Sequence, residues 1–174
     1  MNLDILEEKC QILEKVIIEL SEIYANKDCT KQQKALLETM IGAAIWYLPT
    51  GNELYSGFIS EVALERIKKG AQISELTKEH KFPRKIAGEL LLTEKYKLFL
   101  SGKESLYNLY LNEFGIYNLV DKNENRGLVK HQKSNIFNND VIAYERAGIK
   151  LFQMKIEEIN NCKISKSKSQ RDLI

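Results

Sequence analysis

Apolar residues recur every three or four positions through residues 2–26, which is the spacing of one face of an α-helix. Acids and lysines lie between them, so the segment predicts a long amphipathic helix. Two interpretations are open: the apolar seam packs on the protein's own core, or it pairs with the same helix of a second chain. The seam consists of Leu3, Leu6, Cys10, Leu13, Ile17, Leu20 and Tyr24. Four further apolar residues widen this face, which favours burial against more than one helix. They are Ile12, Val16, Ile18 and Ile23.

Helical spacing also covers several later segments. Thr30 can cap the start of the second helix, and Pro83 can open a later one because its missing N–H is not needed there. Gly70, which follows two lysines, is a typical stop signal. The expected helices span 31–47, a third stretch from Phe58 to Lys69, 83–114, 124 onward with a break near 134–139, and 141–148.

Two shorter segments, near 72–80 and 116–121, predict strands. We expect them to pair as a two-stranded antiparallel ribbon, with the helix from about 124 packed across it. The sequence therefore predicts an α+β fold that is mostly helical. The expected domains are a helical N-terminal scaffold at 1–70, a strand–strand–helix region at 71–150 with a helical insertion at 83–114, and a C-terminal helix with a basic tail at 151–174.

Composition is that of a soluble globular protein, with 44% hydrophobic and 29% charged residues. Residues 1–40 carry a net charge of −3 and the remainder +5, so the body of the chain is better suited to meet a polyanion. The three cysteines form no CxxC pair, which argues against a disulfide framework or a structural zinc site. No signal peptide is recognisable, and the apolar run from Met40 to Pro49 is too short to span a bilayer. We therefore expect a cytoplasmic protein.

Candidate chemistry gathers in two stretches. In the first, Glu79 and His80 stand side by side before Pro83. Histidine is the side chain best suited to accept a proton near pH 7. The bases around it could draw a phosphate group toward the site; they are Lys81, Arg84 and Lys85. The second stretch, just after the second expected strand begins, offers Asn118, Asn123, Asn125, Arg126 and Gly127.

Together the stretches read Glu-His-x-x-Pro, then Asn-x-Val, then Asn-Arg-Gly. This arrangement resembles the HNH endonuclease family, whose catalytic unit is a ββα-metal finger, and in particular the HNH domain of the RNA-guided CRISPR nucleases. The resemblance implies that Glu79 and Asn125 bind one Mg²⁺ or Mn²⁺ ion and that His80 is the general base. It also implies that Asn118 braces the loop carrying His80 and that Arg126 clamps the phosphate. The first acid is usually Asp in the family, and the linker between the two stretches is long here.

The resemblance implies a metal-dependent endonuclease that cuts DNA, of the restriction or phage-defence type. Expected nucleic-acid contacts are Lys81, Arg84, Lys85, Lys130 and Lys133, helped by the basic tail of Lys163, Lys166, Lys168 and Arg171. Two alternatives stay open. One is a non-catalytic helical module that binds nucleic acid or a protein partner. The other is a hydrolase of small phosphoesters, in which His131 joins the site. A homodimer, formed through the helix at residues 2–26, would suit a two-fold symmetric DNA site.

Overall fold

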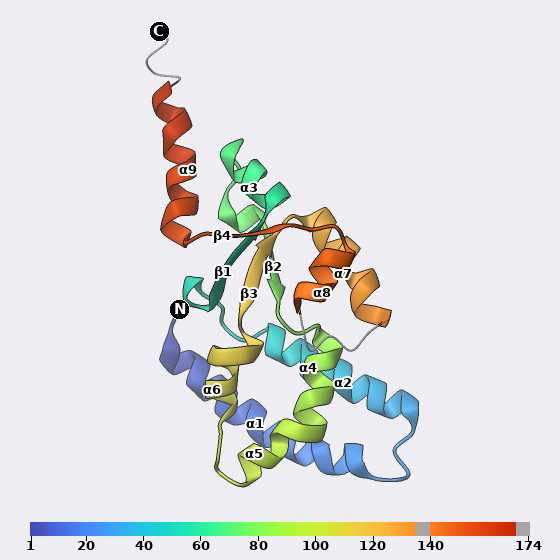
Figure 1. Ribbon diagram of the computed structural model, residues 1–174. Coiled ribbons are helices and arrows are strands. Elements are labelled where there is room, and N and C mark those ends of the chain that lie inside the picture. The colour runs from blue at the N-terminus through green and yellow to red at the C-terminus, as the bar shows by residue number, and fades with distance from the viewer. Residues whose placement is uncertain (135–139, 170–174) are drawn as a thin grey trace. The chain divides into compact units, whose positions relative to one another are not determined.

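The computed structural model describes residues 1–134 and 140–169, without the side chains of residues 132–134, 140–142 and 163–169. Two compact units make up the chain (Figure 1). Unit 1 comprises Met1–Leu54 and His80–Ile116, and unit 2 comprises Tyr55–Glu79 and Tyr117–Ile174. Residues 135–139 of the break expected near 134–139, the side chain of Lys133 and the side chains of the basic tail lie outside the described residues.

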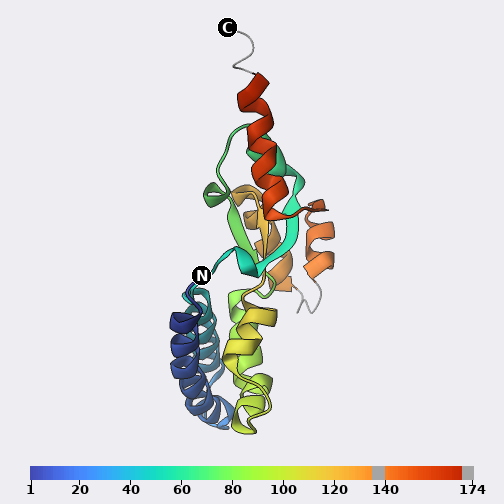
Figure 2. The ribbon, with the colours of Figure 1, turned by 90° about the vertical axis from the view of Figure 1, so that its left-hand side faces the viewer.

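Unit 1 is made of helices in two layers. Figure 2 shows α1 and α2 in one layer and the later helices in the other. The α4 helix continues through a π-helical turn, η3, into α5, and α6 continues into a second π-helical turn, η4. The elements are α1 (Leu3–Ala25), α2 (Lys31–Trp46), η1 (Asn52–Leu54), α4 (Arg84–Leu90), η3 (Leu91–Lys95), α5 (Tyr96–Leu100), α6 (Leu106–Leu109) and η4 (Tyr110–Phe114).

The ends of α1 and α2 follow from local hydrogen bonds. The Asn2 side chain accepts bonds from the backbone N–H groups of Asp4 and Ile5, at 3.1 and 3.2 Å. Thr30 and Gln33 form a reciprocal capping box at the start of α2, which confirms the expected cap.

The middle of the predicted α1 seam is buried within unit 1, whereas Leu3 at its start is 47% exposed. Leu6, Cys10 and Ile17 are at most 1% exposed, and α1 packs against η3, α5 and α6. The seam therefore serves the chain's own core. The expectation that Ile12, Val16 and Ile23 widen this buried face is wrong, because these side chains are exposed.

Two glycines allow α2 and α4 to approach closely. A Cβ atom built on Gly42 would lie 1.9 Å from the backbone oxygen of Arg84. A Cβ atom on Gly88 would lie 2.0 Å from the backbone oxygen of Glu38. Each helix thus presents a glycine to the backbone of the other, and no larger residue fits at this separation.

Unit 2 is built on a four-stranded mixed sheet with the order β2-β3-β1-β4. β1 runs parallel to β3, with Tyr55 opposite Tyr117, and antiparallel to β4. β2 runs antiparallel to β3, because the residue after β2, Lys81, donates its N–H to the carbonyl of Ile116, the residue before β3. The strands are β1 (Tyr55–Ser60), β2 (Thr77–His80), β3 (Tyr117–Val120) and β4 (Leu151–Gln153).

Helices pack on the strands of this sheet. One apolar cluster joins Val120 of β3 and Leu128 of α7 to Ala143 and Tyr144 of α8. The α3 helix packs on β1 and β3, and α9 packs on α3. The helical elements of unit 2 are α3 (Glu61–Lys68), a 3-10 turn η2 (Ile73–Glu75), α7 (Lys122–Ser134), α8 (Asp140–Arg146) and α9 (Ile156–Ser169).

The prediction of an α+β, mostly helical protein is confirmed. The predicted pairing of the segments near 72–80 and 116–121 is confirmed, since β2 and β3 are neighbours in the sheet. They are part of a four-stranded sheet, however, and not of a two-stranded ribbon. Phe58 and Ile59 were expected on a helix but lie on β1. The strand ends at Ser60, whose hydroxyl accepts a hydrogen bond from the N–H of Ala63 and so caps α3. The strand β4 was also missed. None of the described helices is long and apolar enough to cross a membrane.

Gly42→Ala tests the close approach of α2 and α4. The added methyl group meets a backbone carbonyl that cannot rotate away, so we expect a loss of about 1–3 kcal/mol in unfolding free energy. Gly127→Ala is the matched control, because Gly127 lies in α7 and a Cβ atom added there would meet nothing within 4 Å beyond the neighbouring backbone of its own helix. This control should gain about 0.5–1 kcal/mol. Urea denaturation followed by circular dichroism measures both; equal effects would contradict the packing described.

Candidate active site

Glu79 and His80 are the last two residues of β2, and both side chains are buried, at 5% and 6% exposure. Glu79 is in unit 2, whereas His80 is the first residue of the second segment of unit 1. Within unit 1 the imidazole ring of His80 lies 4.8 Å from the ring of Trp46, centroid to centroid. The guanidinium of Arg84 lies 4.1 Å from the ring centroid of Trp46. One indole thus contacts both the candidate base and a candidate phosphate-binding side chain.

The bases that follow His80 are all exposed, but their surroundings differ. Arg84 stacks on Trp46, as described above. Lys85 forms an ion pair with the buried carboxylate of Glu38, at 3.3 Å. Lys81 lies 5.9 Å from the centroid of the Phe82 ring. Lys85 therefore has a structural ion pair within unit 1, whereas the charged groups of Lys81 and Arg84 lie at the surface.

Asn118 lies on β3, and both ends of its amide are occupied within unit 2. Its Oδ1 atom accepts a hydrogen bond of 2.5 Å from the hydroxyl of Ser56 on β1. Its Nδ2 atom donates to the hydroxyl of Tyr144 on α8, at 3.0 Å. Asn118 thus ties β1, β3 and α8 together, which is a structural role that its sequence context did not indicate.

Asn125 lies in the first turn of α7 and is half-buried. Its backbone N–H donates to the carbonyl of Asp121, at 3.0 Å. Among the described residues its side-chain amide makes no hydrogen bond, in contrast to that of Asn118.

The outer face of α7 is basic. Lys122, Arg126 and Lys130 are exposed and are spaced four residues apart, so they lie along one side of the helix. Leu128, which is fully buried, points to the opposite side. Lys133 follows further along the same helix in the sequence. His131 also lies on α7 and is half-buried.

A polar network at the ends of the parallel strands was missed by the sequence analysis. The Ser60 hydroxyl, at the end of β1, donates to a carboxylate oxygen of Glu124, which also accepts from the N–H of Asp121 at 2.9 Å. Arg66 of α3 donates to the other carboxylate, that of Asp121, at 2.8 Å. The signal was present, because Asp121-x-x-Glu124 is an N-capping pattern at the start of a helix.

The charge of Asp121 depends on this network. Burial of the carboxyl group would by itself raise its pKa. The hydrogen bond from Arg66 and the one from the backbone N–H of Asn123 oppose that effect, and the pKa is lowered from its ordinary value of 3.8. Asp121 therefore remains an anion that Arg66 neutralises, and it serves to fix α3 against the start of α7.

The residues implied to hold a divalent metal are Glu79 and Asn125, both in unit 2. A carboxylate and an amide oxygen are suitable ligands for Mg²⁺ or Mn²⁺, ions that keep several water ligands. In the described part of the chain, no three His, Cys, Asp or Glu side chains come together as a metal site. One carboxylate and one amide oxygen would leave the remaining coordination positions of such an ion to water.

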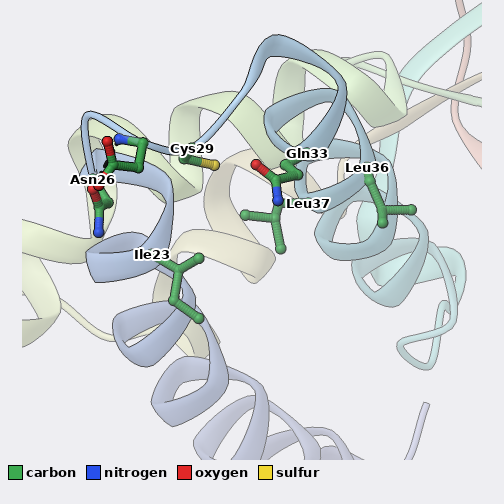
Figure 3. A pocket seen from close by; sticks show the side chains of 7 residues that line it. Ile23, Asn26, Cys29, Gln33, Leu36 and Leu37 are labelled. Atoms are coloured by element: carbon green, nitrogen blue, oxygen red, sulfur yellow. Dashed lines mark hydrogen bonds between the residues drawn. The ribbon is translucent and has the colours of Figure 1, made fainter.

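Unit 1 also has a shallow pocket where α1 turns into α2 (Figure 3). Its volume is about 320 Å³, and Ile23, Leu36 and Leu37 form its apolar wall. The remaining wall is polar and includes Asn26 and Gln33. None of its described lining residues belongs to the two motif stretches, so the pocket is separate from the candidate chemistry.

Comparisons with protein-family models, with curated proteins and with solved structures gave no match to this chain. The assignment of function therefore depends on the residues and their arrangement.

Arg66→Met tests the network around Asp121. At pH 7 we expect a loss of about 1–2 kcal/mol, because a buried carboxylate loses its charged donor. The stabilisation exists above pH 3.8, the ordinary pKa of the group, and is lost as the pH falls through the lowered value. The difference between wild type and variant should therefore close in acid. Lys68→Met, which removes an exposed ion pair with Glu65 on the same helix, is the control and should change little. If the unfolding free energies of wild type and Arg66→Met differ by the same amount in acid as at pH 7, Asp121 is not the partner that Arg66 stabilises.

Proposed function

We propose that this protein is a metal-dependent endonuclease that hydrolyses DNA phosphodiester bonds, of the restriction or phage-defence type. The observation that supports the proposal best is the order of elements around the two motif stretches. Glu79 and His80 close β2, β3 is its neighbour in the sheet, and α7 packs on β3 through Leu128 and Val120. This is the strand–strand–helix order that the resemblance to HNH endonucleases implies, with α4–α6 inserted between the strands.

In this proposal His80 acts as the general base. It takes a proton from a water molecule as the water oxygen attacks phosphorus, and the bond from phosphorus to the leaving oxygen breaks. In this proposal the ring contact with Trp46, 4.8 Å between centroids, helps to orient the imidazole. A base that folding has already positioned is effective, because the reaction step then pays no entropy cost for bringing the base to its substrate.

Electrostatic attraction supports DNA as the substrate. The exposed stripe of Lys122, Arg126 and Lys130 belongs to the helix that carries Asn125. Phosphate contacts of this kind supply most of the sequence-independent affinity for nucleic acid. In this proposal Arg126, which directly follows Asn125 and is exposed, donates its guanidinium N–H groups to the phosphate.

The implied Mg²⁺ or Mn²⁺, held by Glu79 and Asn125, would neutralise charge that develops on the phosphate. We further propose a cytoplasmic site of action. The cysteines of the described chain, Cys10, Cys29 and Cys162, are free thiols, and a reducing compartment keeps them so.

One observation favours a second candidate, a non-catalytic nucleic-acid-binding module. His80 is 6% exposed and packs on Trp46, which also suits a histidine of the core. Such a module would use the basic face of α7 and would need neither His80 nor a metal. The two candidates therefore differ in their response to one substitution.

His80→Ala should keep DNA binding and lower cleavage by about 10²- to 10⁴-fold, the usual effect of removing a general base. The control is His131→Ala, which removes the other histidine of the chain and should leave cleavage near the wild-type rate. Nicking of supercoiled plasmid with Mg²⁺ or Mn²⁺, against an EDTA control, measures the rate. If the wild-type protein cuts no DNA or RNA with either metal, the non-catalytic module replaces the nuclease.

Arg126→Ala and Lys130→Ala should weaken DNA binding and reduce its salt dependence, by about one unit of slope for each phosphate that the variant no longer binds. Lys97→Ala removes an exposed lysine of α5 and is the matched control. Fluorescence anisotropy of a labelled duplex between low and moderate salt gives the slopes. A uniform response of all three variants would show that binding follows total charge and not the face of α7.

A further inference from the structure

Four β-branched apolar side chains form an exposed stripe on α1. Ile5, Ile12, Val16 and Ile23 are 45%, 67%, 41% and 55% exposed. Their spacing of seven, four and seven residues places them on one side of the helix over roughly 27 Å at 1.5 Å per residue. The buried seam of Leu6, Cys10 and Ile17 faces a different direction. A stripe of this length on a water-facing helix marks an interaction surface.

The stripe is symmetric in position. Ile5 and Ile23 are equally far from residue 14, and so are Ile12 and Val16, so the numbers in each pair add to 28. When two identical helices pack antiparallel about a two-fold axis, each residue of one faces its mirror position on the other. Around an axis at residue 14, Ile5 would meet the partner's Ile23, and Ile12 would meet the partner's Val16. Every exposed apolar residue of the stripe then has an apolar counterpart.

The charged residues on the same side of α1 obey the same relation. Lys9 and Glu19 fall between the apolar positions, both are exposed, and their numbers also add to 28. Antiparallel packing would therefore place Lys9 beside the partner's Glu19, twice in the dimer. Glu8, Lys15 and Glu22 flank the stripe on its solvent side, where water and salt screen their charges.

We propose that α1 is a homodimer interface, formed by antiparallel two-fold packing of Ile5, Lys9, Ile12, Val16, Glu19 and Ile23 on a second copy of this chain. A second copy is the occupant because the stripe is complementary to itself, in apolar groups and in charge. Figure 2 shows α1 in a different layer of unit 1 from α4–α6. The residues of the stripe are exposed, so packing through them leaves the core of unit 1 unchanged. This interface differs from a dimer through the predicted seam, which the chain's own core occupies, and it does not depend on the proposed nuclease activity.

The first test is the molecular mass of the full chain in solution. Sedimentation velocity at about 50 µM should give a dimer, and Ile12→Glu should raise the dissociation constant at least about tenfold because it places a carboxylate in the centre of the interface. Leu100→Glu is the matched control, since Leu100 is a 63% exposed leucine at the end of α5 and lies outside the stripe. A monomeric wild type, or a dimer that Ile12→Glu leaves intact, overturns the proposal.

The second test reports the register and does not depend on loss of folding. Lys9→Glu and Glu19→Lys should each weaken the dimer, because each creates two pairs of like charges. The double variant Lys9→Glu/Glu19→Lys restores opposite charges at both pairs and should recover most of the wild-type association. If the double variant is as weak as the single ones, the two residues do not face each other and the antiparallel register is wrong.

Discussion

The parallel pairing of β1 with β3 is the constraint on which unit 2 depends. It joins segments that are far apart in the sequence, with Tyr55 opposite Tyr117 and Ile59 opposite Leu119. Buried polar groups then lock the pair: Asn118 bridges Ser56 to Tyr144, and Ser60 donates to Glu124. Because both strands lead directly into helices, the pairing also fixes where α3 and α7 begin. Asn125 and Arg126 owe their position at the start of α7 to this arrangement.

The two faces of α7 show how one helix meets structural and functional demands. Leu128 packs on Val120 and belongs to the apolar core, whereas Lys122, Arg126 and Lys130 remain exposed. Glu124, between these faces, is used to cap the helix and to tie it to Ser60. If the proposed function is right, substitutions on the basic face should alter DNA binding with little effect on folding, and substitutions on the inner face should do the reverse.

Much of the fold could be predicted from the sequence because helical periodicity and capping residues are local signals. The seam of α1, the Thr30 cap and the strand at Tyr117–Val120 are examples. The strand β1 could not be predicted, because Phe58 and Ile59 fit the helical spacing of α3, and only pairing with distant β3 decides between the two. Asn118 was assigned a role by resemblance, but its partners, Ser56 and Tyr144, come from other parts of the chain. The exposed stripe of α1 could not be predicted either, since periodicity shows which face of a helix a residue lies on but not whether another element covers that face.

The central proposal is that Glu79 and Asn125, both in unit 2, bind a divalent metal. Adding Mn²⁺ to ¹⁵N-labelled protein tests it directly, because the paramagnetic ion broadens the signals of amides close to its site and leaves distant ones sharp. The account predicts selective broadening at Glu79, His80 and the first turn of α7, which disappears in Glu79→Ala. Broadening confined to the acidic residues of α1, or the same pattern in Glu79→Ala, would contradict it.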